Sequence, residues 1–430
     1  MSKQYDVAIV GAGVLGVCMA YWISSTCKAN VCVIDKERLQ AEHASSRNTG
    51  VMHSPFYLDP KTKSTMAKAS LQSYPMWEKI AIDNKIPWKK TGLLELAIKS
   101  EHDATLEKYS KWAKENGILE EEILILDAMQ VKKMEPHIQC HSALYCSREV
   151  STDFGALTRR MAIESQRAGA EYMMGMHLKD VKSVTDGHEL EFDGGTRIEC
   201  DYMINCAGAN SLDIAKMSGS AKQYTDMHFR GEYWVADEQY AKMVETTVYT
   251  VAKYPNYPFL DPHWIKKADG TVEVGPNAVP VLGSEMYSGY VGDIETIFSK
   301  MRQMLQGGTL KLLTNPEFMS LISKEWHSSL SKSAMINRIR SFIPNIRPEF
   351  FLKRGTAGIR TPLISPEGKF VPDVLVEYGT NSIHILNYNS PGATGAPFFA
   401  KHIVRGLCEK GILEYTGHKD GAIWKMNDQD

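Results

Sequence analysis

The stretch YDVAIVGAGVLG, residues 5–16, decides the fold of this chain. Its apolar first half predicts a buried β-strand, and its three glycines follow the pattern G-x-G-x-x-G directly ahead of an apolar helix. Gly11 permits a tight turn, Gly13 lets the backbone approach a pyrophosphate, and Gly16 lets the helix pack closely against the sheet. Because the helix N-terminus then faces the phosphates, the stretch predicts a dinucleotide-binding turn.

An acid follows at the spacing that this motif requires. A second apolar strand, residues 30–34, ends at Asp35, which lies about 20 residues beyond the glycines and is followed by Lys36. An acid at this place meets the hydroxyl groups of the adenosine ribose. Strand, turn, helix and acid together favour a dinucleotide over an ordinary strand-to-helix turn, but they fit NAD and FAD equally well.

Composition and charge restrict the class of protein. The chain has 430 residues and a net charge of −2, so no global field favours nucleic acid as a partner. Its eight cysteines are scattered without a C-x-x-C pair, which indicates a reducing compartment, no disulfide framework and no metal site. There is no room for a signal peptide before the first strand, and no apolar run reaches about 18 residues. We therefore expect a cytoplasmic protein without a transmembrane segment, with peripheral association at the inner face of the membrane left open.

Strand–helix units typical of nucleotide binding occur in three separated parts of the chain, with a mixed α/β insertion between them. A nicotinamide dehydrogenase usually keeps its Rossmann domain contiguous, whereas FAD is long enough to take contacts from distant segments. We therefore expect an α/β fold with a discontinuous, Rossmann-like FAD-binding domain and a substrate-binding domain that contains a large antiparallel sheet. The FAD-binding domain is assigned to residues 1–85, 150–215 and 350–430, and the substrate-binding domain to residues 86–149 and 216–349.

Further motifs are spread over nearly the whole length of the chain. They are RNTGVMHS (47–54), INCAGA (204–209), RGEYW (230–234), YPFLDPHW (257–264), VGPNAV (274–279), SLSKSAMINRIRSFIP (329–344), RGTAGIR (354–360) and ILNYNSPGATGA (385–396). On these motifs the chain resembles the FAD-dependent L-2-hydroxyglutarate dehydrogenases and oxidases of the D-amino-acid oxidase/glycerol-3-phosphate dehydrogenase superfamily. It departs from that family's pattern at Pro55 and Phe56, and again at Asp261, in segments expected on the substrate side of the flavin.

The resemblance implies a non-covalently bound FAD and the oxidation of a 2-hydroxy acid, foremost L-2-hydroxyglutarate to 2-oxoglutarate, by hydride transfer to flavin N5. Electrons then pass to a quinone, another carrier such as a protein, or oxygen. An amino-acid or amine oxidase and a glycerol-3-phosphate or malate-type dehydrogenase are the alternatives, and a non-catalytic flavoprotein ranks after them.

Oxidation of a 2-hydroxy acid requires a base for the hydroxyl proton. Histidine has a suitable unperturbed pKa, and two of the thirteen histidines, His263 and His53, lie in matched motifs. We expect His263 to be the base and His53 to bind substrate, with the reverse assignment as the alternative.

The substrate carboxylate requires a cation. By resemblance to the amino-acid oxidases, Arg360 is expected to hold it with a planar, bidentate fork. The second carboxylate of a diacid needs another cation, for which the chain offers Lys353, Arg354 and Arg230. Tyr257 and Asn277 are expected to add hydrogen bonds.

The cofactor contacts are expected from four regions of the chain. Small residues at 390–395 precede a helix whose N-terminus would stabilise the reduced flavin. The residues expected to contact FAD are Gly11, Gly13, Val14, Leu15, Gly16, Asp35, Lys36, Ser46, Arg47, Asn48, Thr49, Leu178, Ala207, Gly208, Gly392, Ala393 and Thr394.

Overall fold

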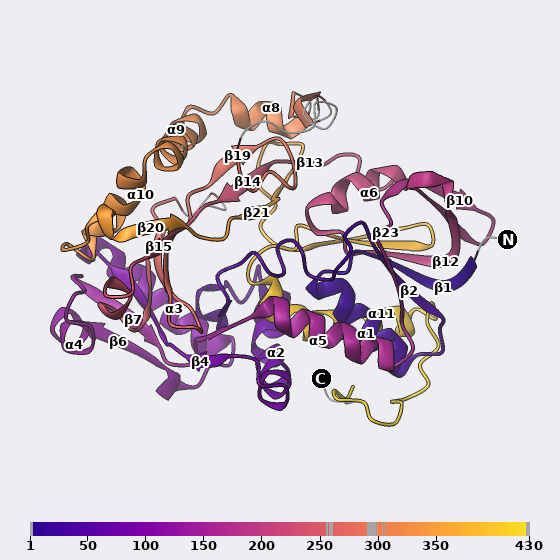
Figure 1. The fold of residues 1–430 in the computed structure, drawn as a ribbon, viewed down its shortest axis with the longest axis horizontal. Helices are drawn as coiled ribbons and strands as arrows, with labels where there is room; N and C mark the ends of the chain where they lie inside the picture. Colours follow the sequence, from indigo (N-terminus) through magenta and orange to yellow (C-terminus); the bar gives the residue numbers. More distant parts are fainter. Residues whose placement is uncertain are drawn as a thin grey trace.

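The computed structural model places two eight-stranded sheets side by side, each with helices packed against it (Figure 1). The described residues are 3–254, 257, 261–289, 298, 300–302, 304–305 and 307–426. Three residues of the motif 257–264 therefore lie outside the described residues. The predicted α/β class with a Rossmann-like part and a large antiparallel sheet is confirmed.

The first sheet has a parallel centre, as the opening motif predicts. Its parallel strands run in the order β24, β12, β1, β2 and β9, and antiparallel β10, β11 and β23 extend it. Their bounds are β1 Lys3–Val10, β2 Val31–Asp35, β9 Glu171–Met174, β10 Leu178–Val184, β11 Gly187–Phe192, β12 Arg197–Asn205, β23 Leu375–Gly379 and β24 Ser382–Leu386. Both faces of this sheet are covered, which explains why its parallel strands are near-continuous apolar runs.

Helices cover this first sheet on both faces. Figure 1 shows α1 (Val14–Thr26), α5 (Phe154–Arg167) and α11 (Gly392–Glu409) together on one face, while α6 (Ser211–Met217) lies on the other. Every residue of α1 is buried, because α1 lies between the sheet and the helices α5 and α11. α2 (Ser64–Asp83) packs against α11. The C-terminal segment after α11 returns to this layer, where Trp424 Nε1 donates a hydrogen bond to the Met76 carbonyl of α2.

The second sheet is antiparallel apart from one parallel pair, β16 with β5. Its strands run in the order β20, β15, β18, β17, β16, β5, β7 and β6. Their bounds are β5 Leu93–Ala97, β6 Ile123–Asp127, β7 Ser142–Cys146, β15 Trp234–Ala236, β16 Thr247–Thr250, β17 His263–Lys266, β18 Val272–Gly275 and β20 Phe351–Arg354. The remaining described α-helices are α3 Asp103–Glu115, α4 Ala128–Met134, α8 Gly307–Leu313, α9 Pro316–Leu330 and α10 Lys332–Arg338.

Small sheets complete the architecture and carry the residues of interest. Their strands are β3 Val51–Met52, β4 Trp88–Lys90, β8 Val150–Thr152, β13 Thr225–Asp226, β14 His228–Gly231, β19 Val279–Val281, β21 Gly358–Arg360 and β22 Leu363–Ile364. β8 pairs with β3 and β4, whereas β14 pairs with β19 and β21. The predicted domain boundaries stay a prediction. Within the described ranges, no helix is both long and apolar enough to cross a membrane.

Candidate active site

The glycine turn has the geometry that a pyrophosphate requires. Gly11 has a φ of +111°, and a Cβ there would lie 2.5 Å from the Cys206 carbonyl oxygen. A Cβ at Gly16 would collide with the Gly11 carbonyl oxygen, so α1 packs as closely as the motif predicts. The first turn of α1 contains no acid, and the Ser45 hydroxyl accepts a hydrogen bond from Val14 N–H at 2.9 Å. The turn and helix N-terminus therefore fit an anionic dinucleotide.

Asp35 lies against this turn. Its Oδ2 accepts a hydrogen bond from Ala12 N–H at 2.6 Å, and its Oδ1 accepts one from Glu37 N–H at 2.8 Å. These bonds fix the carboxylate at the carboxyl end of β2, beside the glycines. Other predicted cofactor contacts lie at the same edge: Leu178 is buried at the start of β10, and Ala207 and Gly208 follow the end of β12.

The predicted loop 46–49 is held by bonds within itself and from elsewhere in the chain. The Asn48 side chain donates to the Ala44 and Ser45 carbonyls and accepts from Gly50 N–H, each at 2.9 Å. From β21, Gly358 packs directly on the Arg47 carbonyl. Lys267, which follows β17, donates to the Asn48 carbonyl at 3.4 Å. The loop is thus positioned by segments of both large parts of the fold.

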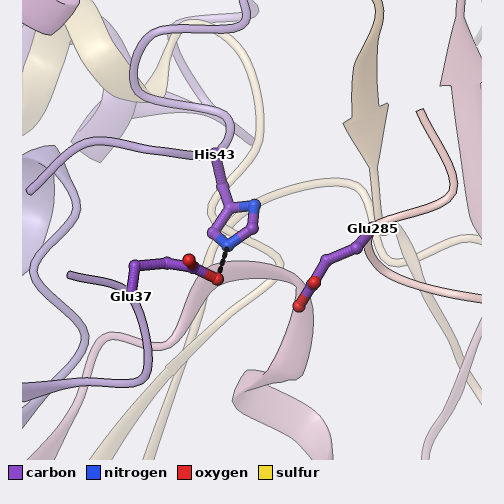
Figure 2. A group of neighbouring side chains, drawn as sticks. All are labelled: Glu37, His43 and Glu285. Atoms are coloured by element: carbon purple, nitrogen blue, oxygen red, sulfur yellow. Dashed lines mark hydrogen bonds and ion pairs between the residues drawn. The ribbon is translucent and has the colours of Figure 1, made fainter. Parts of the chain in front are cut away.

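Residues 36–43, just before this loop, contact residues 285–287. Figure 2 shows the His43 ring bonded to Glu37, with the Glu285 side chain nearby. His43 Nδ1 lies 2.7 Å from the Tyr287 hydroxyl, and His43 Nε2 lies 3.0 Å from Glu37. Lys36 pairs with Glu285. Ligand-type atoms of Glu37, His43 and Glu285 lie within 4.8 Å of one another. Each of these three side chains already has a protein partner. We therefore interpret the group as a contact between two segments of the chain and not as a metal site.

Two histidines from distant segments meet in a cluster that we call the histidine cluster: His53, Tyr57, Glu149, Tyr249, His263 and Arg360. The Tyr249 ring stacks on His263 at 3.9 Å and lies 5.8 Å from His53. Burial lowers the pKa of His263 well below its usual value, and the charges of Arg360 and His53 lower it further. The structure therefore brings both predicted histidines together.

Glu149 is the member of the cluster that the sequence analysis did not identify. It is fully buried, and its Oε1 accepts a hydrogen bond from Ser54 N–H at 2.6 Å. Its Oε2 lies 3.4 Å from His53 Nδ1. Nearby Glu95 has its pKa raised to about 8, by burial and then by the charge of Glu149. The only sequence signal is an acid directly before the short segment Val150–Thr152 that forms β8, which is too common a pattern to identify a site.

Arg360 brings a cation to the histidine cluster. It ends β21 and is half-buried, and its guanidinium has no hydrogen bond or ion pair with the part of the chain that the structure describes. Its charge acts on the titration of His263, Tyr57, Tyr233 and Tyr249. Burial raises the pKa of each of these tyrosines, so all three keep their phenol proton at neutral pH.

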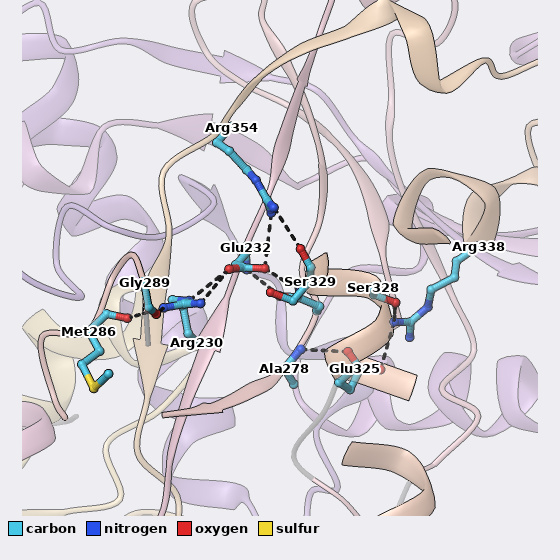
Figure 3. A network of polar contacts seen from close by, with 11 residues as sticks. Arg230, Glu232, Ala278, Met286, Gly289, Glu325, Ser328, Ser329, Arg338 and Arg354 are labelled. Carbon is cyan, nitrogen blue, oxygen red and sulfur yellow. Dashed lines mark hydrogen bonds and ion pairs between the residues drawn. The ribbon is translucent and has the colours of Figure 1, made fainter. Parts of the chain in front are cut away.

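Arg230 is also in this region, but its side chain faces away from Arg360. Phe229 pairs with Arg360 and Arg230 pairs with Ile359, so the two arginines extend to opposite faces of the small sheet. Arg230 pairs with Glu232 at 3.0 Å and donates to the Met286 and Gly289 carbonyls (Figure 3).

The structure places the other predicted substrate contacts outside the histidine cluster. Asn277 is buried and bound to Glu232, donating to its carboxylate at 2.8 Å. The Tyr257 hydroxyl donates to Glu317 at 3.2 Å. Lys353 is exposed on β20.

The predicted flavin edge lies next to His53. The Thr394 hydroxyl, in the first turn of α11, accepts a hydrogen bond from His53 N–H at 3.2 Å. Trp77 Nε1 donates to the Ala393 and Thr394 carbonyls at 3.1 Å and fixes this turn. Gly392 N–H already donates to the Asn389 carbonyl at 2.7 Å. The turn contains no acid and has no side-chain cap, so within the described residues the N–H groups of Ala393 and Thr394 remain available to an anionic partner.

Comparison with known proteins agrees with this geometry. The pattern of the family described as FAD dependent oxidoreductase matches residues 6–405. The chain belongs to this family. Its cofactor is therefore FAD, and it is an FAD-dependent oxidoreductase.

Relatives and solved structures extend over nearly the whole chain. It is 28% identical over 410 residues to the mitochondrial L-2-hydroxyglutarate dehydrogenase of Caenorhabditis elegans, covering 93% of this chain and 92% of that one. It is 27% identical over 404 residues to the L-2-hydroxyglutarate dehydrogenase of Indibacter alkaliphilus, covering 91% and 96%. The fold matches that of FAD-bound L-α-glycerophosphate oxidase from Mycoplasma pneumoniae with a TM-score of 0.77 at 20% identity, covering 99% of both chains.

Within this FAD-dependent family, the glycine turn, loop 46–49 and α11 are the parts of the chain suited to hold the cofactor. Glycines without room for a Cβ flank the α1 N-terminus, and the uncapped α11 N-terminus lies beside His53. The individual FAD and substrate contacts stay predictions.

Proposed function

We propose that this chain oxidises a 2-hydroxy acid at C2, and that L-2-hydroxyglutarate is this acid. The observation that carries the proposal is the half-buried Arg360 guanidinium, unpaired within the described part of the chain, close to two histidines. It offers a bidentate site for the carboxylate next to groups able to accept a proton. Relatives that cover more than nine-tenths of the chain and are named L-2-hydroxyglutarate dehydrogenase support the choice of acid.

His53 is the proposed base, which reverses the order expected from the sequence. Burial and the Arg360 charge oppose protonation of His263. His53 has the Glu149 carboxylate 3.4 Å from its Nδ1, and a carboxylate stabilises the imidazolium that forms when the base accepts a proton. Neutral His263, stacked on Tyr249, is then the group that orients the substrate.

FAD, when bound, supplies the acceptor for the hydrogen and electron pair that leave C2. Residues of the chain bind the substrate and accept its hydroxyl proton. Arg360 fixes the carboxylate, and His53 takes the hydroxyl proton. The buried tyrosines keep their protons and can donate hydrogen bonds to the second carboxylate.

Anaerobic mixing of the holoenzyme with single substrates tests this proposal. We expect L-2-hydroxyglutarate to bleach the flavin absorption, and its D enantiomer, glycerol 3-phosphate and L-glutamate to leave it unchanged. Bleaching by an amino acid alone would assign the enzyme to the amine oxidases, and the absence of bleaching by every hydroxy acid would refute the proposal.

We also propose that the reduced enzyme passes its electrons to a quinone, another carrier or oxygen. Reoxidation of the bleached enzyme by a soluble quinone, compared with air, distinguishes these acceptors. If the acceptor is a membrane quinone, the protein should sediment with vesicles that contain this quinone while remaining active.

A further inference from the structure

Glu149 lies where it can control the catalytic histidine. We propose that Glu149 is the positioning residue of His53: it accepts a hydrogen bond from His53 Nδ1–H, leaves Nε2 free for the substrate hydroxyl, and stabilises the imidazolium. The inference rests on the proposed function, in which His53 is the base.

The contact has one arrangement that satisfies both groups. Glu149 Oε2 and His53 Nδ1 lie 3.4 Å apart without the geometry of a hydrogen bond, and neither atom has a hydrogen-bond partner among the residues that the structure describes. Two buried polar atoms without partners are costly, so a small rotation that forms a hydrogen bond from Nδ1–H to Oε2 satisfies both. Such bonds are often long before substrate binds and tighten in the complex.

Further hydrogen bonds fix the positions of both Glu149 and His53. Glu149 Oε1 is fixed by Ser54 N–H at 2.6 Å, and Ser54 directly follows His53 in the chain. His53 N–H donates to the Thr394 hydroxyl at the start of α11. Glu149 therefore contacts both the backbone and the ring of the same short segment, which fixes the ring plane relative to α11.

Other titratable groups near the ring do not replace Glu149. The groups around His53 are Tyr57 from the turn after β3, Tyr249 from β16, His263 from β17, Arg360 from β21 and, beyond Glu149, Glu95 from β5. Burial keeps Tyr57 and Tyr249 protonated, and Arg360 repels an imidazolium. Glu95 holds its proton below about pH 8. Glu149 is thus the anion in contact with His53.

The proton balance of the step is simple. The substrate hydroxyl gives its proton to His53 Nε2 as C2 gives up a hydride, and the 2-oxo acid forms. His53 is then doubly protonated, with Nδ1–H still bonded to Glu149. When the product leaves, Nε2 releases the proton to solvent and Glu149 returns the ring to the same tautomer.

The test compares Glu149→Gln and Glu149→Asp with wild type and with Glu135→Gln. Glu135 is a matched control, because it is a buried acid that accepts backbone N–H bonds from residues 245 and 246, just before β16. We expect Glu149→Gln to slow anaerobic flavin reduction about 10²-fold or more without a comparable change in substrate affinity. The pH profile of flavin reduction should differ from that of wild type, because the carboxylate next to the His53 ring is gone. Glu149→Asp should recover part of the rate, and Glu135→Gln should match wild type.

A second readout does not require turnover. In protein labelled with ¹⁵N at histidine, the His53 ring signals are identified by their loss in His53→Gln. We expect the wild type to carry the neutral-state proton on Nδ1, and Glu149→Gln to shift it toward Nε2. An unchanged tautomer together with an unchanged pH profile would overturn the inference. If no hydroxy acid reduces the wild-type flavin, the proposed function fails, and the ring signals still decide the Glu149–His53 contact. If Glu149→Gln does not fold, Glu149→Asp decides by the same two readouts.

Discussion

Replacing Glu95 with glutamine should remove a pH dependence from the stability of this protein. Glu95 is buried in β5, where burial and then the charge of Glu149 raise its pKa from 4.5 to about 8. Between these two values the folded chain holds a proton that the unfolded chain has released. Because the unfolded state binds fewer protons, the free energy of unfolding falls as the pH rises through this window.

The size of the effect follows from the two pKa values. Between about pH 6 and about pH 8, linkage gives a loss of about 2 kcal/mol for this single group. Glutamine keeps the shape and does not titrate. All other titratable groups are the same in the two proteins. The difference in the free energy of unfolding between wild type and Glu95→Gln therefore reports the contribution of Glu95 alone.

This contribution of Glu95 can be measured by urea unfolding of both proteins at the two pH values, with equal FAD saturation. We expect Glu95→Gln to gain about 2 kcal/mol relative to wild type on going from the lower to the higher pH. Glu107→Gln, at an exposed position on α3, is the control and should follow wild type. A Glu95→Gln difference that stays constant with pH would show that Glu95 does not hold the proton, and would remove the reason for placing the negative charge on Glu149.

Three further predictions concern the cofactor, the substrate and the C-terminal segment. Gly16→Ala should purify without FAD, seen as loss of flavin absorption per chain, since its Cβ would collide with the Gly11 carbonyl; normal FAD content would contradict this. Arg360→Met should retain FAD and raise the substrate dissociation constant about 10²-fold in a flavin titration, because a charge-assisted bidentate contact is lost; unaltered affinity would rule out the role. Trp424→Ala should lower the free energy of unfolding by about 3 kcal/mol or more in urea while flavin reduction stays unchanged, because it empties a buried aromatic site; a loss below about 1 kcal/mol would contradict the packing.

The sequence predicted the parts of the fold that depend on local geometry. The collisions that a Cβ would make at Gly11 and Gly16 are properties of one strand–turn–helix unit, so the motif determines them within a few residues. The same is true of the acid at the end of β2. His53, His263 and Arg360 could be grouped because each lies in a matched motif, although His263 stands more than 200 positions after His53.

Side-chain partners across the fold could not be predicted in the same way. Glu149 pairs with His53 only because β8 lies against β3, and a one-residue change of register would turn its carboxylate to the other face. Arg230 was expected to face substrate, but Glu232 and two carbonyls occupy its guanidinium. No motif in the sequence indicates a role for Trp424, but in the structure the Trp424 ring packs among Tyr21, Trp22 and Trp77, which are far away in sequence.

The charges of the histidine cluster restrict the kind of acid that can bind there. Glu149 is the anion and Arg360 the cation, while Glu95 and the tyrosines are neutral at pH 7. A carboxylate bound to Arg360 therefore brings net negative charge to the cluster, and a second carboxylate brings more. The nearby cations Lys267, Arg338 and Arg354 each already have a carboxylate partner. We therefore propose that phenol donors such as Tyr57 and Tyr249 bind the distal end of a diacid, and we expect the preference between monoacids and diacids to depend on these tyrosines more than on any arginine.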